Sequence, residues 1–170
     1  MGVTETISAI ARARGYVESA PADRAHRLFA HDGGVVLVIV EDKLTLSLAK
    51  ACASHADRAG ASRLIVVLGA SPTSAARAAL IELAGRPVEV FTFSELSFDI
   101  MKHELVPKFE VLGADEIPAL LHRYRVKLTQ LPRLHYTDPC ARYLGLARGQ
   151  VVRVRRAGSG GESVGYRVVT

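Results

Sequence analysis

LPRLHYTDPCARYLGLARGQ, residues 131–150, has at nearly every position a residue that favours a particular local backbone conformation. Pro132 disfavours helix at the residue before it, so the chain should enter this stretch extended. Asp138 followed by Pro139 is typical of a helix N-cap with proline at the first helical position, where a missing amide hydrogen costs nothing. Gly145 can then end a short helix by adopting a left-handed conformation. The stretch predicts a compact helix-turn-strand corner.

The rest of the carboxyl-terminal part is predicted to be a small α+β domain. Ala-Asp-Glu at 114–116 opens a helix that runs through His122. After the corner, strand 151–156 is expected to pair with strand 163–169 across the glycine-rich turn 158–161, so that the chain ends in a β-hairpin.

The first hundred residues alternate apolar runs with segments of helical period. Helices are expected at 4–14, 44–59 and from the Ser71-Pro72 cap to about 84, with strands at 35–40, 64–68 and 88–93. A polar connection through Pro21, a turn at 31–34 and a short helical segment at 94–100 join them. This alternation predicts an α/β domain whose sheet is flanked by helices.

A change of pattern near Pro107 divides the chain. Pro107 stops a helix and begins an extended connection. We therefore predict an α/β domain at 1–102, a linker at 103–112 and the second domain at 113–170.

The composition indicates a soluble globular protein. Hydrophobic residues make up 49% of the 170, and no run of 18 apolar residues occurs. No secretory signal pattern is apparent at the N-terminus. Cys52 and Cys140 lie in different predicted elements, so neither a disulfide framework nor a zinc site is expected, and the compartment is expected to be reducing. We expect no cofactor, metal, membrane or small-molecule substrate.

The positive charge is confined to the carboxyl-terminal part. Residues 106–170 hold 11 Lys+Arg against 5 Asp+Glu, a net of +6, whereas residues 1–105 hold 11 against 12, a net of −1. Such an excess suits either a solvated face or an acidic partner. The arginines are not interleaved with aromatic residues as in single-strand binding surfaces, which favours a protein partner.

The corner also resembles one family closely. Several short sequence words follow one another in the family's order: Leu-Pro-Arg at 131–133, Thr-Asp-Pro at 137–139, Ala-Arg-Tyr at 141–143, Gly-Leu at 145–146 and Arg-Gly-Gln-Val-Val at 148–152. They resemble the assembly domain of the fifth subunit shared by eukaryotic RNA polymerases, which has a counterpart in the archaeal enzyme. Lys102–Leu112, KHELVPKFEVL, resembles the family's linker, and ASPTSA at 70–75 resembles an element of its N-terminal domain.

The resemblance implies a non-catalytic structural subunit of a DNA-directed RNA polymerase. The C-terminal domain would anchor to the largest subunit, and a jaw-like N-terminal domain would lie near downstream duplex DNA. The expected location is the nucleus, or the virion or infected-cell cytoplasm for a version from a large DNA virus. Family members usually carry a different, proline-containing element in place of the turn at 156–162.

The resemblance also implies a set of subunit-docking residues. They are Arg133, Thr137, Asp138, Arg142, Tyr143, Arg148, Gln150, Tyr166 and Arg167. Asp138 has a sufficient explanation as a helix cap. Exposed arginine and tyrosine are enriched at interface anchors, so Arg133, Arg142, Tyr143 and Arg148 are the expected contacts. The alternative is a solvated surface with pairs inside the chain.

A contact with DNA phosphate is a second expectation. Ser71, Thr73 and Ser74 would lie at a helix N-terminus, where free amides and hydroxyls can donate to phosphate oxygens, and Arg77 follows one turn later. Such a contact positions DNA without reading its sequence. The alternative is that Ser71 only caps the helix.

Two other functions are open from sequence. A free transcription-regulatory adaptor could use the same fold. Asp32, Glu41 and Lys43 resemble the metal-binding pattern of restriction-type nucleases, but the two carboxylates flank one predicted strand and would lie roughly 30 Å apart. Carboxylates that share one Mg²⁺ must lie much closer. Nor does any pair of the six histidines have the spacing of helical metal ligands.

Overall fold

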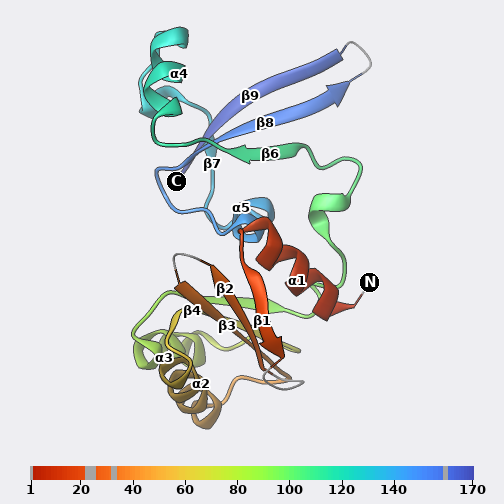
Figure 1. Ribbon diagram of the computed structural model, residues 1–170, viewed down its shortest axis with the longest axis vertical. Helices are drawn as coiled ribbons and strands as arrows, with labels where there is room; N and C mark the ends of the chain where they lie inside the picture. The colour runs from red at the N-terminus through yellow and green to blue at the C-terminus, as the bar shows by residue number, and fades with distance from the viewer. Residues whose placement is uncertain (1, 22–25, 32–33, 159–160) are drawn as a thin grey trace. The chain divides into compact units, whose positions relative to one another are not determined.

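The computed structural model describes residues 2–21, 26–31, 34–158 and 161–170. They form two compact units, Met1–Phe98 and Asp99–Thr170 (Figure 1). No helix within the described ranges is both long and apolar enough to cross a lipid bilayer.

The first unit is built on a mixed five-stranded sheet in the order β1-β2-β3-β4-β5. Its strands are β1 (Val17–Pro21), β2 (His26–His31), β3 (Gly34–Glu41), β4 (Ala61–Leu68) and β5 (Val88–Thr92), and its helices are α1 (Val3–Ala13), α2 (Leu46–Arg58) and α3 (Ser74–Ala84). β1, β2 and β3 pair antiparallel, whereas β3, β4 and β5 pair parallel. The parallel part has the α-helical crossovers that the sequence predicts.

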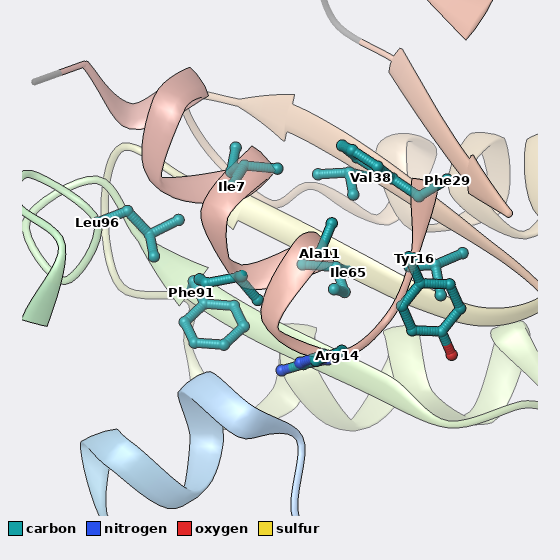
Figure 2. A pocket seen from close by; sticks show the side chains of 11 residues that line it. Ile7, Ala11, Arg14, Tyr16, Phe29, Val38, Ile65, Phe91 and Leu96 are labelled. Atoms are coloured by element: carbon teal, nitrogen blue, oxygen red, sulfur yellow. The ribbon is translucent and has the colours of Figure 1, made fainter. Parts of the chain in front are cut away.

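Alternate residues of the central strands bury opposite faces of this sheet. Leu37 and Ile39 pack with α2 and α3 residues such as Cys52 and Leu80. Val36 and Val38 point to the other face, where α1 lies over the sheet (Figure 2). Between α1 and the sheet is a cavity of about 10 Å³, which leaves room for no ligand larger than a water molecule. The predicted covering of both faces is confirmed.

A partly buried ion network fixes the end of α1 to the sheet. Arg14 donates two hydrogen bonds to the Glu89 carboxylate, at 2.9 and 2.6 Å, and Arg63 donates a third at 2.7 Å. Burial by itself raises the pKa of Glu89, but the two guanidinium groups outweigh it and hold that pKa below its usual value.

Several predictions for the first unit need correction. The polar connection expected through Pro21 is instead strands β1 and β2, which are joined by an ion pair between Arg27 and Glu18. Thr73 rather than Ser71 caps α3, since its hydroxyl accepts the Ala76 amide at 3.2 Å. The helix expected at 94–100 is a turn followed by a 3-10 helix, η1 (Ile100–Lys102). Part of the turn predicted at 31–34 lies outside the described residues.

The second unit contains a four-stranded sheet in the order β6-β8-β9-β7. Its strands are β6 (Lys108–Val111), β7 (Arg133–Leu134), β8 (Val151–Gly158) and β9 (Gly161–Val169), and its helices are α4 (Glu116–Tyr124), α5 (Pro139–Leu144) and the 3-10 helix η2 (Leu128–Gln130). β8 pairs antiparallel with β6 and with β9, and β7 pairs parallel with β9.

Helices cover both faces of this second sheet. Leu120 of α4 packs with Val151 and Val168, whereas Ala141 of α5 packs with Val152 and Val154. The predicted linker, 103–112, supplies strand β6, which pairs with β8. Phe109 of β6 packs against the cluster that contains Ala141. Residues 159 and 160 of the predicted glycine-rich turn lie outside the described residues.

Candidate docking surface

The predicted corner forms with the expected caps. The Asp138 carboxylate accepts the Cys140 amide at 2.8 Å, and Pro139 begins α5. At the other end Gly145 has φ 64°, and the amides of Gly145 and Leu146 return to the carbonyl oxygens of Arg142 and Ala141 at 3.1 and 3.0 Å. This double closure satisfies helix-end carbonyls and turns the chain sharply toward β8.

An exposed arginine-tyrosine pair lies beside this helix. The Arg148 guanidinium carbon is 4.2 Å from the ring centroid of Tyr136, and the tyrosine is 42% exposed. The Tyr136 amide donates to the Thr170 carbonyl at 2.9 Å, which fixes the backbone that carries the ring. Tyr136 was not among the predicted docking residues. The only sequence signal for Tyr136 was a tyrosine next to a turn. Its stacking partner, Arg148, follows after α5, so neighbouring residues did not reveal the pair.

Tyr143, expected to be exposed, is buried. It is 5% exposed, and its hydroxyl is hydrogen-bonded to the Asp99 carboxylate. Burial first, and then this carboxylate, raise the pKa of Tyr143. Asp99 is itself buried and accepts the Met101 amide at 3.1 Å, so it caps η1. Tyr143 therefore ties α5 to η1 within its own unit.

The other arginines of the corner differ in exposure. Arg133 is exposed, while Arg142 and Arg167 are half-buried. Arg167 donates through Nη1 to the Arg133 carbonyl at 3.1 Å, across the pairing of β9 with β7. Arg133 and Arg148 are thus the predicted arginines that are most accessible.

Thr137 and Gln150 have local structural roles. The Thr137 hydroxyl lies 2.6 Å from Nδ1 of His135. The Gln150 side-chain oxygen accepts the Ala147 amide at 2.7 Å and so closes the turn that holds Arg148. Both side chains remain exposed.

Tyr166 belongs to a separate aromatic cluster near α4. Its ring centroid lies 5.7 Å from that of Tyr124 and 5.8 Å from the Arg153 guanidinium carbon. Arg153 also donates to Glu110 at 3.1 Å, so this layer joins β6, β8 and β9 to the helix. Tyr166 has a packing role that its position in the sequence did not show.

At the N-terminus of α3, the predicted phosphate-contact residues are all exposed. They are Ser71, Thr73, Ser74 and Arg77. Thr73 uses its oxygen to accept a backbone amide, which leaves the hydroxyl hydrogen for another acceptor. Contact of these residues with DNA phosphate stays a prediction.

Comparison with known proteins identifies the family. The model of the RNA polymerase Rpb5 C-terminal domain matches residues 98–169. Over 151 residues the chain is 36% identical to the subunit RPABC1 of DNA-directed RNA polymerases I, II and III from Caenorhabditis elegans, covering 88% of this chain and 67% of that protein. This chain belongs to the Rpb5 family.

Two further relatives agree with this assignment. An Arabidopsis thaliana protein named DNA-directed RNA polymerase subunit 5-like protein 1 is 48% identical over 96 residues, which are 56% of this chain and 46% of that protein. The Dictyostelium discoideum subunit rpabc1 is 41% identical over 112 residues, which are 64% of this chain and 57% of that protein. The Rpb5 domain match coincides with the second unit almost residue for residue.

Both cysteine thiols of this Rpb5-family chain have raised pKa values. Burial first, and then Asp138, raise the pKa of the Cys140 thiol to about 11, and burial with Glu41 raises that of Cys52 to about 11, so both thiols are protonated at neutral pH. In the part of the chain that is described, no three His, Cys, Asp or Glu residues form a group that could hold a metal. Asp32, of the nuclease-like pattern, lies outside that part.

Proposed function

We propose that this chain is a non-catalytic structural subunit of a multisubunit DNA-directed RNA polymerase. The observation that carries the proposal is 36% identity over 151 residues to a polymerase subunit, spanning both compact units. Its second unit anchors it to the largest polymerase subunit, and transcription is the process in which it takes part.

The exposed corner of the second unit supports the anchoring role. Arg148 stacked on Tyr136, together with exposed Arg133, presents large side chains on a backbone held by caps and turns. Arginine and tyrosine on a rigid base lose little conformational entropy on binding and are frequent interface anchors. The net charge of +6 in residues 106–170 suits an acidic face on the partner.

The first unit is proposed to be the jaw-like part that lines the downstream DNA cleft. The start of α3 supports this proposal, because its free amides, the hydroxyls of Thr73 and Ser74, and Arg77 suit a phosphate group. Contact through phosphates would be independent of DNA sequence. In a eukaryotic polymerase the chain resides in the nucleus, whereas a viral polymerase would place it in the virion or infected cytoplasm.

Affinity purification from the native source tests the anchoring. We expect the tagged chain to recover the large polymerase subunits, and Arg148→Glu with Arg133→Glu to reduce that recovery by at least about tenfold, as loss of interface anchors does. Lys50→Glu, a charge reversal on exposed α2, is the matched control and should leave recovery unchanged. Recovery of regulatory proteins without any large subunit would instead indicate a free adaptor.

The proposed DNA contact needs its own measurement. Within assembled polymerase, Arg77→Glu should lower photo-crosslinking of this chain to downstream duplex DNA, while crosslinking of the other subunits stays constant. Arg58→Glu on α2 offers a control of equal charge change. Equal crosslinking yields for the two variants would exclude the α3 terminus from the cleft.

A further inference from the structure

One edge of the second sheet is open along most of β9. β7 occupies this edge only opposite Val168 and Val169, whereas β9 begins at Gly161. On its other side β9 pairs with β8 from Gly161 to Val168 (Figure 1). Among the described residues, no strand pairs with the outer edge of β9 before Val168. An edge of this kind presents a row of backbone donors and acceptors.

The register shows which backbone groups face the open edge. The amides of Val168 and Thr170 donate outward, to the carbonyl oxygens of Pro132 and Leu134, each at 2.9 Å. Val169 donates instead to Gln150, toward β8. Because the direction alternates along a strand, the amides and carbonyls of Val164 and Tyr166 also point outward.

Pro132 is the physical reason that the edge opens where it does. Its carbonyl accepts the Val168 amide, so in a parallel ladder its own amide would donate to the Tyr166 carbonyl. Proline has no amide hydrogen, and the ladder stops there. The preceding backbone therefore cannot continue along β9.

A hollow beside this edge is large enough to receive a side chain from a partner. It measures about 210 Å³ and lies where Gly165 faces Val154 across the sheet. A Cβ atom added at Gly165 would meet nothing within 4 Å, so the missing side chain leaves real space. Among the described residues that line the hollow are Arg156 and Arg167, and none of the lining residues is acidic.

We propose that the open edge of β9 receives an extended acidic segment of another polymerase subunit as an added strand. The segment hydrogen-bonds to Val164 and Tyr166, and one of its carboxylate side chains enters the hollow between Arg156 and Arg167. This inference rests on the proposed function and states how the partner is held. β7 already shows that an extended segment can pair at this edge.

Charge distinguishes a partner subunit from a second copy of this chain. Residues 151–170 hold four arginines and one glutamate, and Glu162 lies 3.9 Å from Arg155 as an ion pair. Two such edges would bring like charges together, which opposes pairing between copies. An acidic strand meets the arginines with opposite charge.

Hydrogen exchange at single-residue resolution tests the added strand directly. In assembled polymerase the amides of Val164 and Tyr166 should exchange at least about tenfold more slowly than in the isolated chain. Ser163 and Gly165, which point toward β8, serve as internal controls. Unchanged exchange in a polymerase that does contain the chain overturns the added strand and leaves the proposed function standing, whereas absence of the chain from polymerase overturns both.

A proline substitution separates strand addition from simple coverage of the surface. Val164→Pro removes an outward amide without breaking the ladder to β8, because edge positions with outward amides tolerate proline. It should lower competitive incorporation into polymerase by about tenfold, which corresponds to about 1.4 kcal/mol. Val164→Thr keeps the amide and should compete equally with the unaltered chain. Equal incorporation of the proline variant would contradict the proposal; if that variant fails to fold, the exchange result decides.

The occupant of the hollow has a separate test. Arg156→Glu should reduce incorporation several-fold, and Arg156→Lys, which keeps the charge, should reduce it less. Equal incorporation of both variants would remove the carboxylate from the proposal. Protection of Val164 that grows with the concentration of the isolated chain would assign the edge to a second copy and overturn the inference.

Discussion

The guanidinium of Arg148 stacks on the ring of Tyr136, with 4.2 Å between the guanidinium carbon and the ring centroid. The turn closed by Gln150 holds the arginine, and the bond from the Tyr136 amide to Thr170 holds the tyrosine. A cation and an aromatic ring in this relation attract each other by about 0.5–1 kcal/mol at an exposed site. The stacking therefore favours this arrangement of the two side chains over others.

Removal of the Tyr136 ring should weaken docking more than folding. Tyr136→Ala is expected to reduce incorporation into polymerase about tenfold, as loss of an interface anchor does. Its free energy of unfolding should fall by no more than about 1 kcal/mol, since the ring is partly exposed. Tyr136→Phe keeps the stacking and is the matched control. Normal incorporation of Tyr136→Ala would place the pair outside the interface.

Tyr143 should behave in the opposite way. Tyr143→Phe removes the hydrogen bond to buried Asp99 and is expected to lower the free energy of unfolding by about 2 kcal/mol, measured by urea titration. Incorporation of the folded variant should be unchanged. A loss of incorporation at unchanged stability would show that the hydroxyl contacts the partner instead.

The network at Glu89 predicts an acid-sensitive first unit. Because the folded-state pKa of Glu89 lies below its unfolded value, its contribution to stability is complete above the unfolded pKa, about 4.5. That contribution is lost as pH falls through the lower, folded-state pKa. Thermal unfolding followed from pH 7 to pH 3 should show this decline, and Glu89→Gln should flatten it.

Glu89→Gln should also lower the free energy of unfolding at neutral pH. At pH 7, Glu89→Gln should lower the free energy of unfolding by about 3 kcal/mol, because the largely buried Arg14 guanidinium loses its ion pair with Glu89. Glu18→Gln, which affects the more exposed pair with Arg27, should cost less than about 1 kcal/mol. Equal effects of the two variants would contradict the structural role of the Glu89 network.

Arg125 offers a stabilising substitution. It follows α4 with φ 51°, a left-handed conformation that costs about 1 kcal/mol for a residue with a side chain. Arg125→Gly should raise the free energy of unfolding by about 0.5–1 kcal/mol, measured by chemical denaturation. Arg123→Gly, within the helix, should lower it by a similar amount.

Local chemistry made the corner predictable from sequence. The Asp138 cap, Pro139 at the first helical position and the left-handed Gly145 act on neighbours in the chain, so their structure follows from residue types alone. The same applies to the central strands, whose apolar runs are long and continuous. The short sequence motifs of the corner also indicated the family, and the comparisons confirm it.

Edges and contacts between distant segments were decided only by the tertiary structure. Strands β1, β2 and β6 are short or polar and acquire their conformation from a neighbour whose position no local pattern specifies. The Tyr143 hydroxyl bonds to Asp99, far away in the chain. Arg148 meets Tyr136 where both neighbouring backbones are bonded to the end of the chain, Gly149 to Val169 and Tyr136 to Thr170. A cap needs only adjacent residues, but burial and pairing need the remainder of the fold.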